Sequence, residues 1–452
     1  MMGCDGAEAR VEQALPDCGP DDRRGLAGCD YCLGPAQEAS LGPTGANSVR
    51  RKVPDSTIRG QRGKKVVLMS TRYPLDHPGG VERVGRELSE RIGACRGDWR
   101  VVPIAAYSAR HGAARVPLLG DIVAAAKIAV AVAMTQSDAV VVHGAEYGWA
   151  PLLVARLTRR PALVVWHGVR SMEVFPPPRR VAGRLARRVF VQASQVLERV
   201  ALSACGTVAV SPSVAADIQE RFGFEGSVQI IPNGVAPRLD LRPDSSESTT
   251  VEDPLRVIWV GTTAYKKGLD LAIAACQAAR AAGQNLHLTV VGLATSRLTF
   301  SPGSDSTWVS WLGPLQPSEV DSLLGTHDVL LMPTRYEACS MVVLEALAAG
   351  LPVIGSGVIG WQVRECGEVV VGESAYAYAE ALGRMGDAER RRKMGLLAVQ
   401  RARDFSWDAA VVKYVGLLNE MLERYNGKGS SRGRRGVESR MQRHWWMRRG
   451  SR

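Results

Sequence analysis

Two successive series of short apolar runs, separated by longer helix-compatible segments, constrain the fold of this chain more than any other feature. Six runs lie between residues 64 and 232, and six more lie between residues 256 and 371. Short apolar runs bounded by polar residues are typical of parallel strands that are buried on both faces. Strands that alternate with helices form doubly wound sheets. The sequence therefore predicts an α/β protein with two Rossmann-like domains that face a central cleft.

Composition divides the rest of the chain. The first 63 residues are rich in Gly, Pro, Asp and Arg without periodicity, and a Pro- and Ser-rich stretch separates the two series of runs. Such composition is typical of disordered or linking segments. The predicted segments are a disordered extension at 1–63, a first domain at 64–236, a linker at 237–254, a second domain at 255–404, a helix at 405–425 and a disordered tail at 426–452.

Cysteine usage and apolar segments bear on location. The nine cysteines form no dense framework, so a reducing, cytoplasmic setting is expected. Cys29 and Cys32 make a single C-x-x-C motif, which without a second half is a weak sign of a metal or redox site. The start of the chain lacks the apolar core of a signal peptide. The most apolar stretch, Ile122–Met134, is too short to span a bilayer and contains a lysine, so a buried helix is predicted.

Positive charge gathers in two places within a formal net charge of +12. From residue 426 onward, nine Lys or Arg residues accompany a single acid, with Trp445 and Trp446 among them. Between Arg180 and Arg188, four arginines (Arg180, Arg184, Arg187 and Arg188) would share one face of a helix. Both segments can dock on an anionic membrane surface or can simply be solvated. Nucleic acid is the competing partner for the tail, and the membrane is favoured over it.

Residues 333–350 place two carboxylates eight residues apart. Glu337 lies in a polar turn after an apolar run, and Glu345 lies on an Ala- and Leu-rich segment that is expected to be helical and to end at Gly350. In this geometry one acid can reach a sugar, while the other can accept hydrogen bonds from ribose hydroxyls. The backbone N–H groups expected to face an anion between them are those of Cys339, Ser340, Met341 and Val342. The pattern favours a nucleotide diphosphate sugar, and the alternative is a pair of solvated surface acids.

Further candidates follow other predicted strands at their carboxyl ends, where ligands bind in open α/β sheets. The adjacent Gly79 and Gly80 lie between a strand and a helix, where they permit positive φ and close approach of a phosphate. His167 ends a strand and can donate to a sugar hydroxyl or to the acceptor, or can be purely structural. His143 ends another strand and is a weaker candidate.

Two more loops contribute candidates. The segment 261–268 begins with Gly261 and Thr262 and ends with Lys266, Lys267 and Gly268. A lysine there supplies a compact positive charge for a pyrophosphate. Asn233 is followed by a glycine, and Asn-Gly is a strong turn signal by itself, so a ligand role and a structural role both stay open.

These motifs together resemble the retaining, two-domain (GT-B) glycosyltransferases of family 4. The family has a sequence motif in which a Glu is followed, after seven residues, by Glu-Ala-x-Ala-x-Gly-x-Pro-Val. This chain matches it with Glu337, Glu345-Ala346-Leu347-Ala348, Gly350 and Pro352-Val353. The Gly-Phe-Gly that often follows the first Glu is replaced by Ala338-Cys339-Ser340, where Ser340 is expected to act as the N-cap. The resemblance covers roughly residues 64–424.

The resemblance implies transfer of a sugar from a nucleotide diphosphate sugar to an acceptor hydroxyl, on a glycan or a lipid-linked molecule, with retention of configuration. Glu337 and His167 would contact the donor sugar, and Glu345 would hold the ribose. Lys267 and the Gly79-Gly80 loop would face the diphosphate. The family works without a bound metal or other cofactor. The helix at 405–425 would cross back to the first domain.

One departure from the family wording bears on activity. The family pairs an arginine with Lys267, and Thr262 stands in that place. Arg72, Arg335 or Lys266 would have to compensate, or turnover would be slower, or the donor would bind differently. Two other functions therefore stay open, a nucleotide-sugar epimerase of GT-B fold and a catalytically impaired protein that binds a glycan or nucleotide.

Overall fold

The computed structural model describes residues 65–75, 79–94, 99–107, 117–173, 181–204, 206–238, 253–293 and 307–430. The predictions for the extension at 1–63, for most of the linker and for the tail beyond residue 430 lie outside the described residues, as does Arg180. Among the helices within those ranges, none has both the length and the apolar composition that spanning a membrane requires.

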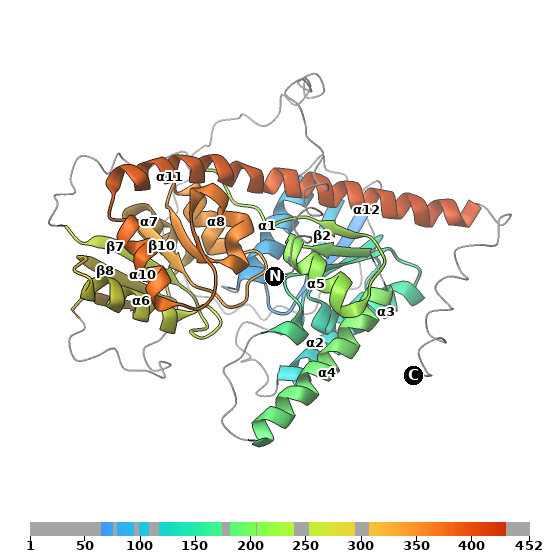
Figure 1. Cartoon of the computed structure of the whole chain (residues 1–452). Helices are drawn as coiled ribbons and strands as arrows, with labels where there is room; N and C mark the ends of the chain where they lie inside the picture. The colour runs from blue at the N-terminus through green and yellow to red at the C-terminus, as the bar shows by residue number, and fades with distance from the viewer. Residues whose placement is uncertain are drawn as a thin grey trace, which may run out of the picture. The chain divides into compact units, whose positions relative to one another are not determined.

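The first domain is built on a sheet of six parallel strands in the order β2-β1-β3-β4-β5-β6 (Figure 1). The strands are β1 (Lys65–Thr71), β2 (Trp99–Ala105), β3 (Ala139–His143), β4 (Ala162–Trp166), β5 (Gly206–Ala209) and β6 (Val228–Ile230). All residues of β3 and β4 are buried. Since a central parallel strand is covered by helices on both faces, its residues can all be apolar, which is why these runs were visible in the sequence.

The second domain repeats this plan with the strand order β12-β11-β10-β7-β8-β9, again all parallel. The strands are β7 (Leu255–Val260), β8 (Leu286–Val291), β9 (Val309–Gly313), β10 (Val329–Met332), β11 (Val353–Ser356) and β12 (Gly367–Val370). All twelve strands overlap the predicted apolar runs. The predicted α/β class with two doubly wound sheets is confirmed.

Within its described residues, the first domain has five longer helices: α1 (Gly80–Ala94), α2 (Pro117–Met134), α3 (Ala145–Leu157), α4 (Val181–Ala204) and α5 (Pro212–Phe222). Ser211 caps α5, because its hydroxyl accepts a hydrogen bond from the Val214 N–H at 3.2 Å. The prediction of a buried helix at Ile122–Met134 was wrong in part. Ile128 and Val132 of α2 are buried, but Val130 is 57% exposed and Met134 is 79% exposed. The helix is apolar on both sides, so apolar content alone does not reveal which side is covered.

The helices of the second domain are α6 (Leu269–Ala281), α7 (Pro317–Thr326), α8 (Met341–Ala348), α9 (Gly360–Val363), α10 (Ala375–Arg384) and α11 (Ala388–Ala402). They are followed by α12 (Trp407–Ser430), which packs against elements of the first domain (Figure 1). Asp408 on α12 pairs with Arg91 of α1 at 3.0 Å, and the Asn419 side chain accepts a hydrogen bond from Lys65 Nζ at 2.8 Å.

The α12 helix continues to Ser430, into the segment predicted as a disordered tail from residue 426. Disorder was expected there because the segment is rich in Gly, Ser and Arg, and its first residues include glycines at 427 and 429. Glycine weakens a helix by about 1 kcal/mol relative to alanine but does not terminate it by itself. A helix that is already nucleated and anchored by its first turns can therefore extend past them.

Candidate active site

The loops that follow β7 and β10 pack directly against each other. Gly268, at the end of the first loop, has φ of 67°, and a Cβ atom there would lie 1.9 Å from the Pro333 carbonyl oxygen. The Thr334 hydroxyl donates to the Lys266 carbonyl at 3.0 Å. Glycine at 268 is therefore required both by its conformation and by this contact. The packing brings Lys267 and Glu337 to the same place.

Lys267 and Glu337 form an ion pair in which the lysine ammonium donates to the carboxylate. The side chains are 19% and 14% exposed. Burial by itself would raise the pKa of Glu337, but the charge and hydrogen bond of Lys267 outweigh it and hold that pKa below its ordinary value. Glu337 is therefore ionised at neutral pH. Two of the predicted site residues, a lysine and a carboxylate, are therefore in direct contact.

Glu345 lies on α8, about one turn inside the helix, and it pairs with Arg83 from the first turn of α1. Burial raises the pKa of Glu345 to about 7, although the charge of Arg83 opposes the shift. The contact joins a residue of the first domain to the predicted ribose-binding acid of the second. Sequence reasoning missed Arg83, whose only signal was its place three residues after the paired glycines.

The beginning of α8 differs from the prediction. Ser340 occupies the N-cap position, but its hydroxyl makes no capping hydrogen bond. Its backbone N–H donates to the Gln362 side-chain oxygen at 2.9 Å, so it does not face an anion. Ser340 is therefore the N-cap residue, as predicted, but its side chain does not cap the helix, and the prediction that its N–H group faces an anion was wrong. Met341 and Val342 are the first two helical residues, and their N–H groups have no partner within the helix.

Cys339 and Asn233 hold this turn in place from inside. Both side chains are buried, and the Asn233 amide donates to the Cys339 carbonyl at 3.2 Å. Burial raises the pKa of the Cys339 thiol to about 12. The predicted site residues Asn233 and Cys339 therefore support the turn that carries Glu337. For Asn233 the contact favours the structural alternative that the sequence left open.

His167 and His143 lie together at the ends of β4 and β3. The Nδ1 atom of His143 is 2.9 Å from Nε2 of His167, and the rings are stacked with centroids 5.2 Å apart. Burial lowers the pKa of His167 to about 4 and lowers that of His143 well below its ordinary value. Both imidazoles are therefore neutral at pH 7. His143, the weaker of the two sequence candidates, is the direct partner of the stronger one.

Tyr336 connects the His167 loop to the Glu337 turn. Its hydroxyl donates to the Val169 carbonyl at 3.1 Å and accepts from the Val169 N–H at 2.6 Å. Gly168 has φ of 138°, and a Cβ atom there would lie 3.0 Å from the tyrosine oxygen. Two hydrogen bonds from one hydroxyl thus fix the His167 loop against the residue that precedes Glu337. Sequence reasoning passed over this tyrosine, although it lies inside the diagnostic motif.

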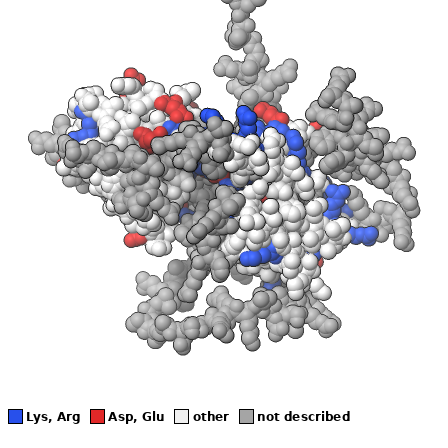
Figure 2. Space-filling model, turned by 90° about the horizontal axis from the view of Figure 1, so that it is seen from below, with Lys and Arg blue, Asp and Glu red and all other residues white. Residues whose placement is uncertain are grey.

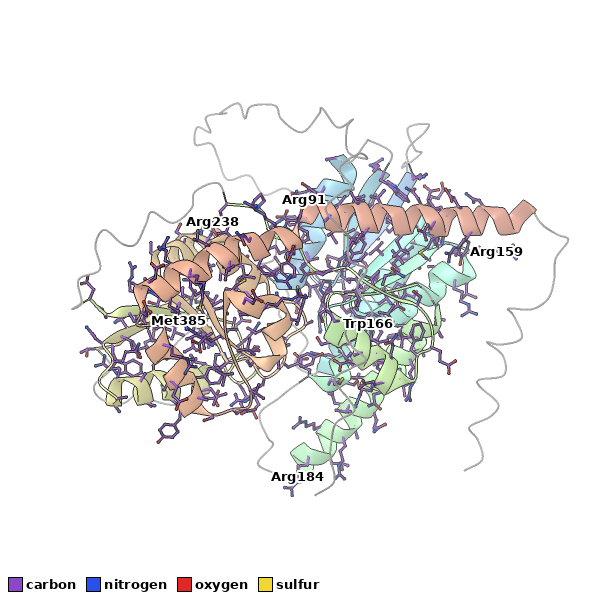
Figure 3. All side chains as sticks on the ribbon, turned by 45° about the horizontal axis from the view of Figure 1, so that its top comes forward. Arg91, Arg159, Trp166, Arg184, Arg238 and Met385 are labelled. Atoms are coloured by element: carbon purple, nitrogen blue, oxygen red, sulfur yellow. The ribbon has the colours of Figure 1, made fainter. Side chains whose placement is uncertain are left out.

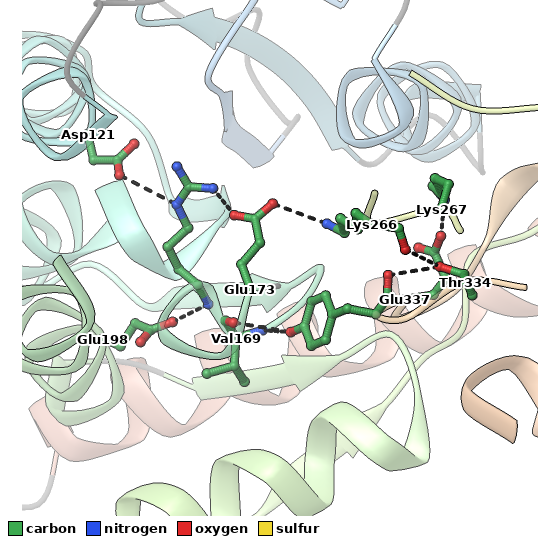
Figure 4. A network of polar contacts seen from close by, with 10 residues as sticks. Asp121, Val169, Glu173, Glu198, Lys266, Lys267, Thr334 and Glu337 are labelled. Atoms are coloured by element: carbon green, nitrogen blue, oxygen red, sulfur yellow. Dashed lines mark hydrogen bonds and ion pairs between the residues drawn. The ribbon is translucent and has the colours of Figure 1, made fainter. Parts of the chain in front are cut away.

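A chain of charged side chains runs beside these residues (Figure 4). The Lys266 ammonium donates to Glu173 at 3.2 Å, and Glu173 also pairs with Arg170. Arg170 lies 3.8 Å from Asp121, and Arg72 lies 2.7 Å from Asp121. Burial raises the pKa of Asp121 to about 6. Lys266 thus forms an ion pair with Glu173 of the first domain, whereas Lys267 pairs with Glu337.

Arg335 is not available to replace the missing arginine. Its guanidinium pairs with Asp270 and with Glu373, each at 2.8 Å, and lies 4.3 Å from the ring centre of Tyr265. The hydrogen bond with Asp270, followed by that with Glu373, raises the pKa of Arg335 above its ordinary value. The expectation that Arg335 compensates for Thr262 is therefore contradicted. Arg72 and Lys266 lie in the charged chain described above.

The remaining predicted glycines behave differently from one another. Gly80 does not adopt positive φ, so the conformational reason offered for glycine at that position was wrong. A Cβ atom on Gly80 would meet nothing within 4 Å. No contact within the described chain therefore requires glycine at position 80. Gly261 is buried, and a Cβ atom there would approach the Trp259 ring to 2.7 Å, whereas the neighbouring Thr262 is exposed.

Comparison with known families gives two matches that follow each other along the chain. Residues 61–239 match the profile described as Glycosyltransferase Family 4, and residues 254–387 match Glycosyl transferases group 1. The two matched segments contain the first and second sheets respectively.

Similar proteins point the same way. A D-inositol 3-phosphate glycosyltransferase from Corynebacterium glutamicum is 34% identical over 128 residues, which cover 27% of this chain and 31% of the relative. A glycogen synthase from Mycobacterium tuberculosis is 30% identical over 246 residues, covering 50% of this chain and 56% of that protein. The chain thus spans about a third to about half of the length of these relatives.

A solved structure shows the same fold. The sucrose-phosphate synthase from Thermosynechococcus elongatus superposes with a TM-score of 0.63 at 18% identity, covering 80% of this chain and 100% of that chain. The predicted GT-B architecture is confirmed by this likeness together with the two parallel sheets.

Proposed function

This chain belongs to glycosyltransferase family 4, and from that premise we propose that it moves a sugar from a nucleotide diphosphate sugar to an acceptor hydroxyl with retention of configuration. The observation that carries the proposal is the ion pair between Lys267 and Glu337, which Tyr336 ties to the loop of His167. The acceptor belongs to a glycan or a lipid-linked molecule. The chemistry proceeds without a metal cofactor.

Lys267 has the role of stabilising the leaving group. As the sugar–phosphate bond breaks, negative charge develops on the diphosphate, and a preorganised cation there stabilises the transition state more than the ground state. The N–H groups of Met341 and Val342 at the start of α8 add partial positive charge on the same anion. The space around Gly80 suits the approach of a phosphate, since a side chain there would meet no atom of the described chain.

Glu337 serves the sugar. Its ionised carboxylate can stabilise positive charge that develops at the sugar's reacting carbon, and it can accept a hydrogen bond from a sugar hydroxyl. Lys267 keeps it ionised and oriented before the donor arrives. In a retaining reaction without a second placed carboxylate, the acceptor attacks from the face that the diphosphate leaves, and the departing phosphate takes the acceptor's proton.

The histidine pair favours one tautomer of His167. The Nε2 atom of His143 is buried and has no hydrogen-bond partner among the described residues. A proton on that atom would be a buried donor without an acceptor, which is costly. The proton therefore belongs on Nδ1 of His143, from which it is donated to Nε2 of His167. His167 then carries its own proton on Nδ1 and offers that N–H to the substrate.

Replacing His143 tests this assignment. His143→Asn retains a donor near the Nδ1 position and should keep most of the activity. His143→Asp presents only acceptors, so it should force the His167 proton to Nε2 and lower kcat/KM by about 10- to 100-fold, the value of one or two hydrogen bonds. The ¹⁵N chemical shifts of the His167 ring report the tautomer directly. An unchanged tautomer in His143→Asp would contradict the assignment, whether or not activity falls.

Thermal unfolding in the presence of UDP-, GDP- and ADP-sugars tests the proposed function. A donor at one hundred times its Kd stabilises the folded state by about 2.7 kcal/mol, which should raise Tm by about 3 to 4 °C in a chain of this length. Release of nucleotide diphosphate that depends on an added acceptor then supports transfer. Formation of an epimer of the donor sugar would support an epimerase instead. Binding without any product would support a protein that recognises the donor without turnover. That alternative arises because Thr262 stands where the family has an arginine.

A further inference from the structure

Exposed apolar side chains gather on two helices of the first domain. Among the described residues, eight of the seventeen large apolar side chains that are exposed lie on α2 and α4. Among them are Val130 and Met134 on α2 and Leu185 and Val189 on α4, which are 57%, 79%, 62% and 57% exposed. Single exposed apolar residues are ordinary on a protein surface, but a concentration of them marks an interaction site.

The two helices belong to one layer on one face of the sheet. In the strand order β2-β1-β3-β4-β5, the connections through α2, α3 and α4 all advance in the same direction. Right-handed crossovers that advance in one direction place their helices on the same face. The α3 helix contacts both of the others, and α2 also contacts α4. On α2, the exposed apolar positions recur every three or four residues, so they form a single stripe along its outer side.

The first part of α4 projects from this layer. Six consecutive residues, Arg184–Val189, are all exposed. A helix that lies on a protein surface buries at least one residue in each turn, so this part is covered on no side. Figure 3 shows Arg184 near the free end of the helix, pointing away from the body of the domain.

The charge on these helices has one sign. The exposed charged residues within 118–134 and 183–197 are Lys127, Arg184, Arg187 and Arg188. The single acid in those ranges is Asp121, which is 1% exposed and paired with Arg72. Seen from below, Lys and Arg side chains stand around a broad area that carries little negative charge (Figure 2). The matching partner must therefore be anionic and must accept aliphatic side chains.

We propose that α2 and residues 183–197 of α4, together called the α2–α4 surface, dock this protein on an anionic lipid bilayer. The aliphatic side chains enter the boundary between headgroups and acyl chains, while the arginines extend to the lipid phosphates. The core of a protein–protein interface would be expected to present aromatic anchors. Within the two ranges, Phe190 is the one aromatic residue, and it is only partly exposed.

The α2–α4 surface lies next to the candidate active site. Asp121 lies in the first part of α2, and it pairs with Arg72 and Arg170 of the charged chain. The Arg170 guanidinium also lies 5.4 Å from the ring centre of Phe190 on α4. Docking would therefore bring the membrane close to the site that takes the acceptor. That consequence, a membrane-embedded acceptor, rests on the proposed function, whereas membrane binding does not.

Co-sedimentation of the full chain with vesicles tests the proposal. Vesicles of phosphatidylcholine mixed equally with phosphatidylglycerol should bind the chain, and vesicles of phosphatidylcholine alone should bind it much less. The triple variant Arg184→Gln, Arg187→Gln, Arg188→Gln should bind the anionic vesicles on the order of 100-fold more weakly, since each basic residue contributes about fivefold. The basic segment beyond residue 430 is present in both proteins, so a difference between them reports on the three arginines.

A matched pair of double variants tests the apolar part. Leu185→Ser with Val189→Ser should weaken binding by about tenfold or more, whereas Leu396→Ser with Val412→Ser, at side chains exposed to 54% and 66% on other helices, should leave it unchanged. Equal binding by the arginine variant and the original chain would overturn the proposal. So would self-association that Leu185→Ser with Val189→Ser abolishes, if vesicle binding is absent, because the surface would then serve a second copy. Vesicle binding without any donor-induced thermal shift would refute the proposed function alone.

Discussion

Replacing Lys267 by methionine is expected to lower kcat/KM for sugar transfer by about 100- to 1,000-fold, the usual effect of removing one preorganised group that stabilises a developing anion. Methionine preserves the apolar part of the side chain and removes the charge. Donor affinity should change less than kcat, because the charge that Lys267 stabilises grows as the diphosphate leaves. Steady-state kinetics with the donor found by thermal shift gives both values.

The same substitution has a second effect with its own pH signature. In the original chain, Lys267 holds the pKa of Glu337 below its ordinary value despite burial. Without that charge, burial prevails and the pKa of Glu337 rises. The residual activity of Lys267→Met should therefore increase as pH rises, until Glu337 is ionised again. In Lys267→Met with Glu337→Gln this pH dependence should be absent, which separates the two effects. A loss of activity in Lys267→Met that is the same at every pH would contradict the pairing.

Replacing Glu345 by alanine is expected to weaken nucleotide binding by about 100-fold, since a carboxylate that accepts hydrogen bonds from two ribose hydroxyls contributes about 1.5 kcal/mol or more through each. The affinity of the original chain should also depend on pH, because the pKa of Glu345 in the free protein is about 7. Below that pH the carboxyl is protonated, and affinity should fall by about tenfold per pH unit. Isothermal titration with the nucleotide diphosphate from pH 5 to 8 measures this.

Two further variants control for this prediction. Arg83 opposes the rise in the pKa of Glu345, so Arg83→Met should move the midpoint of the affinity curve above pH 7. The stability of the fold should change with pH in the direction opposite to that of most carboxylates, whose pKa values are lowered by folding. The folded-state pKa of Glu345 is raised, so the original chain loses stability as pH rises from about 4.5 to about 7. Glu345→Gln should lack that loss in a plot of Tm against pH. Near-normal nucleotide binding by Glu345→Ala would remove the ribose assignment.

Twelve strands and the positions of the two motif acids could be predicted from the sequence because the signals involved are local. A parallel strand buried on both faces is an uninterrupted apolar run, and β3 and β4 are the clearest cases. Glu337 and Glu345 belong to a turn and the helix that follows it, so their spacing alone places one before α8 and one inside it. The family resemblance rests on the same local wording, and both matched profiles agree with it.

Contacts between residues far apart in the chain were decided by the tertiary structure. Arg335 had the right charge to replace a missing arginine, but Asp270 and Glu373 hold it elsewhere. The Tyr336 hydroxyl donates a hydrogen bond to the carbonyl of Val169, a residue 167 positions away, and no local sequence pattern predicts that contact.

By itself, then, the sequence of this protein determined the two α/β sheets, the family and the residue types at the site, because apolar periodicity and motif spacing act over short stretches of chain. The folded structure alone decided which charges pair, which histidine supports the other, and which side of α2 stays uncovered. These outcomes depend on how whole layers of helices and strands pack, and a layer is built from segments that the chain brings together only on folding.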